Sequence, residues 1–164
     1  MKKLTLPVFL LFCFGLSLPA LGASCADRVV VAKSERRLYL YQGEDVLRSY
    51  EIALGKNPVG HKFRQGDKRT PEGRYTLDRR NSQSRFYRSI HISYPNESDR
   101  RRAEAKGVHP GGNIMIHGVP NLYRDGQEFF IGWDWTEGCI AVTNDDMKEI
   151  WTLVADNTPI EIHP

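Results

Sequence analysis

A cysteine and a histidine, each next to a glycine, are the residues of this 164-residue chain best suited to chemistry. Cys139 follows Gly138, and His117 ends the apolar run 114–116 and precedes Gly118. A thiol is a strong nucleophile only as the thiolate, and a nearby histidine is the usual proton acceptor at neutral pH. The two motifs therefore predict that His117 and Cys139 meet in the fold and form a site for cysteine acyl transfer.

Acyl transfer by a thiol also needs a group that orients the base and donors that hold the oxyanion. Gly138 has no side chain to obstruct a carbonyl that approaches the thiol, and the backbone N–H groups around Gly138 and Cys139 are the expected oxyanion donors. A strand that ends at His117 would hold the imidazole more rigidly than a loop. The competing interpretation is an inert buried cysteine and a histidine of the core.

The other histidines do not form a metal-binding pattern. His61 and His109 stand next to loop residues, and His163 is close to the C-terminus. Zinc sites built from Cys and His use closely paired ligands such as CxxC or HxxxH, and the chain contains neither spacing. We therefore expect no metal ion.

The N-terminus has the pattern of a secretory signal. Lys2 and Lys3 supply the positive region, Leu4–Leu18 is almost wholly apolar, and the small residues at 19–23 suit cleavage after Ala23. The apolar run is too short for a confident membrane span. This pattern predicts a signal peptide at residues 1–23 and one domain at residues 24–164, exported to the periplasm.

A second interpretation of this region is a lipoprotein box. Residues 22–25 loosely resemble one, with Cys25 as the lipidated residue, although Gly22 stands where leucine is usual. Lipid on Cys25 is the only route to a membrane that we expect. Cys25 could alternatively pair with Cys139 after export, but a bond to a terminal segment would restrain little.

The charge balance points away from nucleic acid. The full chain has 23 basic and 20 acidic residues, and removal of Lys2 and Lys3 with the signal leaves 21 basic and 20 acidic residues. A protein this close to neutrality shows no electrostatic signature of binding to nucleic acid or to a membrane surface.

The apolar pattern predicts a mainly β protein with a few helices. Short β-branched and aromatic runs bounded by Gly and polar clusters are typical of strands. They occur at 28–55, 74–77, 89–94, 113–117 and 159–162, with a polar turn or loop at 78–85, long loops at 55–73 and 118–132, and a short strand or packing plug at 129–131.

Two segments have helical composition. Residues 96–106 are polar and precede Gly107, which suits a helix C-terminus on the surface. A second helix begins at Asn144 with Asn144 or Thr143 as its N-cap, and its residues Met147, Ile150, Trp151 and Val154 fall on one apolar stripe.

Three motifs together resemble the L,D-transpeptidase catalytic domain of the YkuD family, in particular its YafK-like subgroup. They are residues 66–75 (GDKRTPEGRY), 114–118 (IMIHG) and 136–140 (TEGCI), and residues 57–62 and 93–96 add to the similarity. The resemblance runs from about Arg28 to the C-terminus. It implies a β-sandwich fold and periplasmic work on peptidoglycan, without a metal or organic cofactor.

The resemblance also implies a reaction. Cys139 would attack the carbonyl of a diaminopimelate residue in a stem peptide and expel terminal D-alanine. His117 would act as base and then as acid, with the Gly118 carbonyl orienting its imidazole. The thioester would then pass to an amine of another stem, which makes a 3–3 crosslink, or to a lipoprotein lysine.

Two positions depart from the family pattern. The family often has a histidine where this chain has Glu137, and usually an arginine where this chain has Ala141. The arginine is thought to support the active-site loop or the substrate carboxylate. A carboxylate at Glu137 would raise the pKa of a nearby thiol, so it instead suits the amine of an acceptor or the diaminopimelate centre.

Two alternatives to the transferase remain open. One is an amidase or carboxypeptidase that lets water resolve the same thioester, since the YafK-like subgroup is associated with cleaving protein–peptidoglycan links. The other is a cell-wall-binding module in which Cys139 does no chemistry. Candidate substrate-binding residues are Glu137, Thr136, Trp135, Arg69 and Tyr94.

Overall fold

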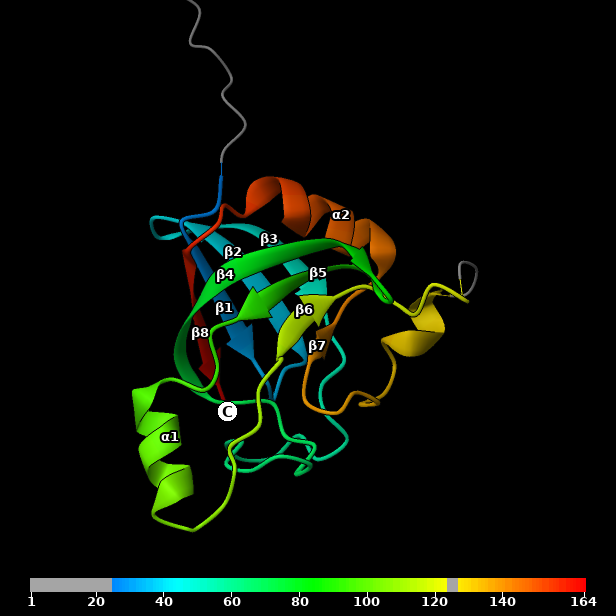
Figure 1. Ribbon diagram of the computed structural model, residues 1–164. Helices are drawn as coiled ribbons and strands as arrows, with labels where there is room; N and C mark the ends of the chain where they lie inside the picture. Colours follow the sequence, from blue (N-terminus) through cyan, green and yellow to red (C-terminus); the bar gives the residue numbers. More distant parts are fainter. Residues whose placement is uncertain (1–24, 124–126) are drawn as a thin grey trace, which may run out of the picture.

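A computed structural model describes residues 25–123 and 127–164 of the chain (Figure 1). The expected signal peptide at residues 1–23 lies outside the described residues. In the part that the structure describes, no helix is long and apolar enough to cross a membrane. Cys25 and Cys139 are both free thiols, so the pairing that export would permit is absent from the described chain.

Eight strands form one sheet in the order β3-β2-β1-β8-β4-β5-β6-β7. The strands are β1 (Arg28–Ala32), β2 (Arg37–Gln42), β3 (Asp45–Glu51), β4 (Gly73–Ser84), β5 (Tyr87–Ile92), β6 (Met115–His117), β7 (Ile140–Ala141) and β8 (Thr158–His163). The helices are α1 (Glu97–Glu104), α2 (Asn144–Leu153) and a short 3-10 helix at Gln127–Phe130.

The two edges of this sheet come together. Ala53, two residues after the end of edge strand β3, exchanges two backbone hydrogen bonds of 2.9 Å with Ala141 of the opposite edge strand β7. The sheet therefore curls back on itself around the core, as Figure 1 shows. The mainly β, sandwich-like class expected from the sequence is confirmed.

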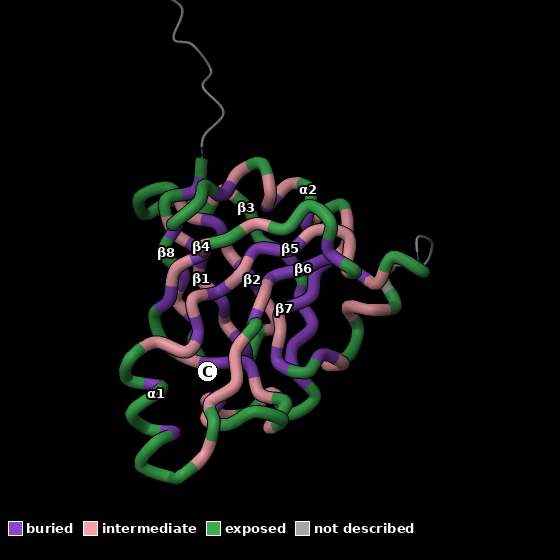
Figure 2. Tube along the Cα trace, in the orientation of Figure 1, coloured by how far each residue is buried: buried purple, intermediate pink, exposed green. Residues whose placement is uncertain are grey.

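The core forms because alternate strand residues face the inside of the curl. In β1 and β2, Val29, Val31, Leu38 and Leu40 are fully buried, and each contributes roughly 1.5–3 kcal/mol when it leaves water. Figure 2 shows the buried positions concentrated along the strands. Helix α2 packs against β5 and β6, the strands nearest the candidate site.

Helix α2 follows the expected pattern. Thr143 is its N-cap and accepts a hydrogen bond from Asp146 N–H through its hydroxyl. Met147 and Ile150 are fully buried, as the apolar stripe predicted. The side-chain oxygen of Asn144 accepts instead from Val119 N–H, which ties the start of this helix to the segment that follows β6.

Two sequence expectations about single segments are wrong. Residues 78–85 were expected as a turn or loop, but β4 continues to Ser84, because the hairpin with β5 extends beyond the core and pairs through its backbone despite its polar side chains. Residues 129–131 were expected as a short strand or a packing plug; the strand is wrong, because the segment begins in a 3-10 helix, whereas Phe130 does pack against Trp135, 5.6 Å between ring centroids.

Helix α1 is held to the sheet by one buried carboxylate. Asp99 completes a capping box with Asn96, accepts from Tyr75 OH at 3.0 Å, and lies 2.5 Å from Arg102 and 3.1 Å from His61. Its side chain is 1% exposed, so these partners replace the water that it lost.

We expect Asp99→Ala to lower the free energy of unfolding by about 3 kcal/mol, because the buried donors around it lose their acceptor. Chemical denaturation followed by circular dichroism measures the effect. The control is Glu97→Ala, which removes an exposed ion pair with Arg101 on the same helix and should cost under about 1 kcal/mol. Equal losses in the two variants would contradict the role assigned to Asp99.

Candidate active site

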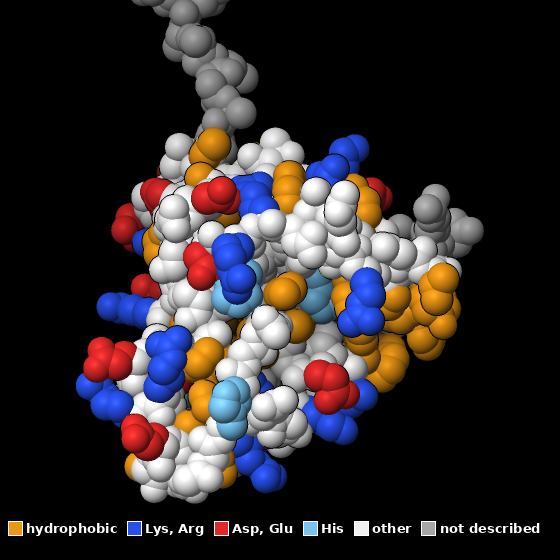
Figure 3. Space-filling model, in the orientation of Figure 1, with side chains coloured by type: hydrophobic (Ala, Val, Ile, Leu, Met, Phe, Trp, Pro, Cys, Tyr) orange, Lys and Arg blue, Asp and Glu red, His pale blue; other side chains and the backbone are white. Residues whose placement is uncertain are grey.

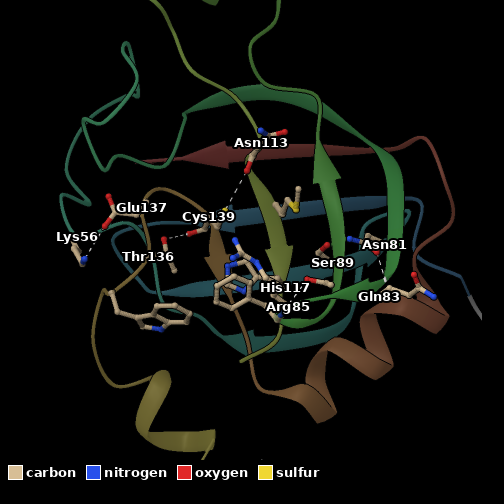
Figure 4. A pocket seen from close by; sticks show the side chains of 14 residues that line it. Lys56, Asn81, Gln83, Arg85, Ser89, Asn113, His117, Thr136, Glu137 and Cys139 are labelled. Carbon is tan, nitrogen blue, oxygen red and sulfur yellow. Dashed lines mark hydrogen bonds and ion pairs between the residues drawn. The ribbon is translucent and has the colours of Figure 1, made fainter. Parts of the chain in front are cut away.

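His117 and Cys139 are brought together by the parallel pairing of β6 with β7. Ile116 pairs with Ile140 and His117 pairs with Ala141, so Cys139 lies across from Met115 on the same face of the sheet as His117. Both side chains line one cavity of about 790 Å³ (Figure 4). The fold therefore brings His117 and Cys139 together in one site, as their residue types predicted.

The imidazole of His117 is oriented by its own chain. Nδ1 lies 2.6 Å from the carbonyl oxygen of Gly118, and because a carbonyl can only accept, Nδ1 carries the proton. Nε2 is then left with a free lone pair, which is the form of histidine that acts as a base. A Cβ on Gly118 would lie 2.3 Å from the side-chain oxygen of Asn144, so this turn has no space for a side chain.

Burial keeps His117 neutral. The residue is 4% exposed, and the rings of Phe86 and Trp135 lie 4.7 and 5.8 Å from its own ring. Loss of water lowers the pKa of His117 to about 4, although the hydrogen bond to Gly118 raises it in part. At neutral pH the imidazole is therefore uncharged and ready to accept a proton.

Burial also keeps Cys139 protonated. Loss of water raises the pKa of the Cys139 thiol above its usual value, more than the hydrogen bond with the Met115 backbone and the charge of Lys62 lower it. The Sγ atom lies 3.6 Å from the carbonyl oxygen of Asn113. The pair is thus a neutral thiol beside a neutral imidazole rather than a thiolate beside an imidazolium.

Thr136 shapes the turn that presents the thiol. Its hydroxyl accepts from Gly138 N–H at 3.1 Å and donates to the Cys139 carbonyl oxygen at 2.7 Å. Its own backbone bonds to Leu54, on the segment that follows β3. The residue is 3% exposed, and it also lines the cavity. The hydrogen bond to the Thr136 hydroxyl also occupies Gly138 N–H, one of the two amides expected to hold an oxyanion.

Gly138 is required by the same turn. Its φ of +127° is open to glycine but unfavourable for other residues. A Cβ on this residue would lie 2.6 Å from the carbonyl oxygen of Arg69, in the long 55–73 loop. That loop therefore packs directly behind the turn that carries Cys139.

The remaining expected residues fall into two groups. Glu137 and Trp135 line the cavity; Glu137 is largely exposed and pairs with Lys56 at 2.8 Å, and the hydrogen bond from Lys56 lowers the pKa of Glu137. Arg69 and Tyr94 are not among the residues that line it. Tyr94 is 2% exposed and donates to the carbonyl oxygen of Pro110, as a core residue does.

Several residues of the cavity were not expected from the sequence. They come mainly from the β4–β5 hairpin and from the segment before β6, namely Asn81, Gln83, Ser84, Arg85, Phe86, Ser89, Asn113 and Met115. The sequence predicted a strand at 89–94, but not which residues its polar face meets. Figure 4 shows Asn81, Gln83 and Ser89 on the opposite side of His117 from Glu137, and Arg85 next to His117.

A patch of exposed hydrophobic side chains lies near this cavity. Figure 3 shows orange side chains gathered at one end of the face that carries the site. The large exposed hydrophobic residues of the neighbouring segments are Leu122, Tyr123, Phe129 and Trp133. Among the described residues, no three His, Cys, Asp and Glu side chains are close enough to hold a metal ion.

We expect Gly138→Ala to slow acyl transfer from p-nitrophenyl acetate to Cys139 at least tenfold, because the added Cβ displaces the turn and small misplacements at a reacting centre are costly. Acylation is followed by mass spectrometry of the intact protein. Gly132→Ala is the matched control, since a Cβ there meets no atom within 4 Å. A Gly138→Ala rate equal to that of the control would refute the requirement for glycine.

The depressed pKa of His117 makes stability depend on pH. In unfolded chains histidine titrates near 6.5, whereas burial lowers the pKa of His117 to about 4 in the fold. Between these values the unfolded chain binds more protons, so the free energy of unfolding falls as pH falls from about 6.5 to about 4, by on the order of 3 kcal/mol.

Urea denaturation across this pH range, in the native protein and in His117→Gln, measures that contribution. The variant has no group to titrate at this position, so its stability should change less over the same interval. Parallel curves for the two proteins would show that His117 is not the group responsible.

Comparisons with known proteins agree with this geometry. Residues 26–162 match the family model of YkuD, the L,D-transpeptidase catalytic domain. YafK of Escherichia coli (strain K12), named as an L,D-transpeptidase, is 35% identical over 133 residues, which are 77% of this chain and 46% of YafK. The chain therefore spans about half the length of this relative.

Two solved structures share the fold. The helical cell shape determining protein Pgp2 of Campylobacter jejuni, as its K307A mutant, has a TM-score of 0.61 and 26% identity over 86% of this chain and 48% of its own. An L,D-transpeptidase of Xylanimonas cellulosilytica has a TM-score of 0.55 and 15% identity, and the match covers 86% of this chain and 62% of the transpeptidase chain. This is a similarity of fold alone. The family match over residues 26–162, nearly all of the described chain, shows that this protein belongs to the YkuD family of L,D-transpeptidase catalytic domains.

Proposed function

We propose that the protein is a periplasmic cysteine acyltransferase that acts on the stem peptides of peptidoglycan. The observation that carries the proposal is the pairing, in one cavity, of a neutral thiol with an imidazole whose Nε2 is free to accept a proton. Family membership supports peptidoglycan as the substrate. The signal pattern at residues 1–23 supports the periplasm as the compartment.

Acylation begins with both groups uncharged. As the Sγ atom of Cys139 attacks the carbonyl carbon of a diaminopimelate residue, the thiol proton passes to Nε2 of His117. The carbonyl electron pair moves onto oxygen, and because Thr136 already accepts from Gly138 N–H, we assign the Cys139 N–H as the oxyanion donor. Collapse breaks the amide bond, and the departing D-alanine amine takes the proton from His117.

Deacylation reverses these proton transfers. An amine of a second stem peptide, or of a lipoprotein lysine, attacks the thioester and gives its proton to His117, which returns it to the departing sulfur. The products are a new amide and the free thiol. Glu137 stands on the wall of the cavity beside the thiol, where its carboxylate suits the ammonium group of an arriving acceptor or of the diaminopimelate centre.

The hydrolase alternative uses the same thioester, with water in place of the amine. The two reactions therefore differ in their products and not in their first step. The binding-module alternative differs at the first step, because it forms no bond to Cys139.

We expect purified protein, without its signal, to convert tetrapeptide muropeptides into 3–3 crosslinked dimers with release of D-alanine. Mass analysis of the muropeptides identifies the products, and Cys139→Ala is the control that should form none. Tripeptides or released lipoprotein in place of dimers would establish the hydrolase. Absence of a covalent Cys139 adduct with a carbapenem, while iodoacetamide still labels the thiol, would favour the binding module.

A further inference from the structure

Ser89 is a buried polar residue without a partner. It is 1% exposed, and its Oγ is one of two buried side-chain polar atoms in the described chain that make no hydrogen bond. A buried hydroxyl without a partner costs free energy, and native proteins contain few of them. Ser89 lines the cavity that holds Cys139 and His117, so a ligand in that cavity can reach it.

The sheet places Ser89 on the far side of His117 from the thiol. In the antiparallel pairing of β5 with β6, Ser89 is directly opposite His117, and β7 with the preceding Cys139 lies on the other side of β6. Directly opposite residues in such a pair have side chains on one face, with Cβ atoms about 5 Å apart. The imidazole therefore lies between the nucleophile and the Ser89 hydroxyl (Figure 4).

If the proposed function holds, the order Cys139, His117, Ser89 fixes the orientation in which the substrate peptide binds. The scissile carbonyl carbon must lie at Cys139, and the departing nitrogen must be within reach of His117 to receive its proton. The residue that leaves then extends beyond His117, toward β5. Its free α-carboxylate is one carbon away from that nitrogen.

A cation lines the same cavity. Arg85 lies in the loop of the β4–β5 hairpin, since Ser84 pairs with Tyr87, and it lines the cavity. Among the described residues its guanidinium has no ion-pair partner, whereas Lys56, the other cation of the lining, is paired with Glu137. Ala141, beside His117 on β7, offers no charge.

We propose that Ser89 and Arg85 form a subsite for the free α-carboxylate of the residue that leaves. The hydroxyl donates to one carboxylate oxygen, and the guanidinium neutralises the charge and donates further hydrogen bonds. The subsite makes the site selective for the last residue of a peptide, because a residue inside a longer chain has no free carboxylate to present. An acceptor amine attached to a carbon that bears a carboxylate fits the same subsite once the first residue has left.

The test compares two donors, a stem tetrapeptide with a free C-terminal carboxylate and its C-terminal amide. We expect the native protein to release D-alanine from the acid with a kcat/KM at least tenfold above that for release of D-alaninamide from the amide. Ser89→Ala and Arg85→Gln should each lower kcat/KM for the acid about tenfold or more and leave the amide nearly unchanged.

Two controls separate recognition from folding. Arg74→Gln removes a positive charge from β4, at a residue that lines neither the catalytic cavity nor the adjoining cavity that contains Ser89, and should keep the preference for the acid. Ser89→Ala should keep or raise the melting temperature, because it removes an unpartnered buried hydroxyl. Equal losses with both donors, or no preference in the native protein, would overturn the subsite.

A binding arm keeps this test separate from that of the proposed function. In a Cys139→Ala background, calorimetry should show tighter binding of the acid than of the amide, and Arg85→Gln should abolish the difference. If native Cys139 accepts neither donor while this binding preference persists, the proposed function fails and the subsite stands. If the acid and the amide bind equally, the subsite fails whatever the reaction does.

Discussion

The site depends on a parallel pairing of two very short strands. β6 has three residues and β7 has two, and their register alone places Cys139 on the same face as His117. Two paired strands of this length are unstable in isolation. They persist here because β6 is also paired with β5, and because Ala53 bonds to Ala141 from the other edge of the curled sheet. The curl of the whole sheet is therefore what sets the distance between thiol and base.

Burial then sets the chemistry of the pair. Both groups lose water, which raises the pKa of Cys139 and lowers the pKa of His117, so each is uncharged at neutral pH. In the proposed reaction, the thiol proton therefore moves as the sulfur attacks. A site of this kind develops its charges only in the transition state, where donors such as the Cys139 N–H stabilise them most effectively.

The two walls of the cavity differ in what they offer. Beside the thiol, Glu137 and Lys56 form an exposed ion pair, a weak interaction that a charged ligand can displace. On the other wall, the β4–β5 hairpin offers the buried Ser89 hydroxyl and Arg85, which has no ion-pair partner among the described residues. In our proposal, this asymmetry distinguishes the leaving side of the cavity from the side that retains the acyl group.

The sequence by itself predicted the candidate reacting groups and determined the local elements around them. The flanking glycines singled out Cys139 and His117 as candidates, and the capping pattern placed the N-cap of α2 at Thr143 or Asn144, of which the structure uses Thr143. These signals are local, because they depend on residues within one turn or one strand.

Tertiary structure decided the features that depend on long-range contacts. Thr136, a candidate substrate-binding residue, lines the cavity while its hydroxyl bonds to the turn that carries Cys139, and Tyr94 belongs to the core. The polar stretch after Leu77, expected as a loop, extends β4 and forms the hairpin that brings Ser89 opposite His117. Spacing along the chain does not predict that Ser89 lies opposite His117. This contact arises from strand register and from the curl of the sheet, which bring together residues far apart in sequence.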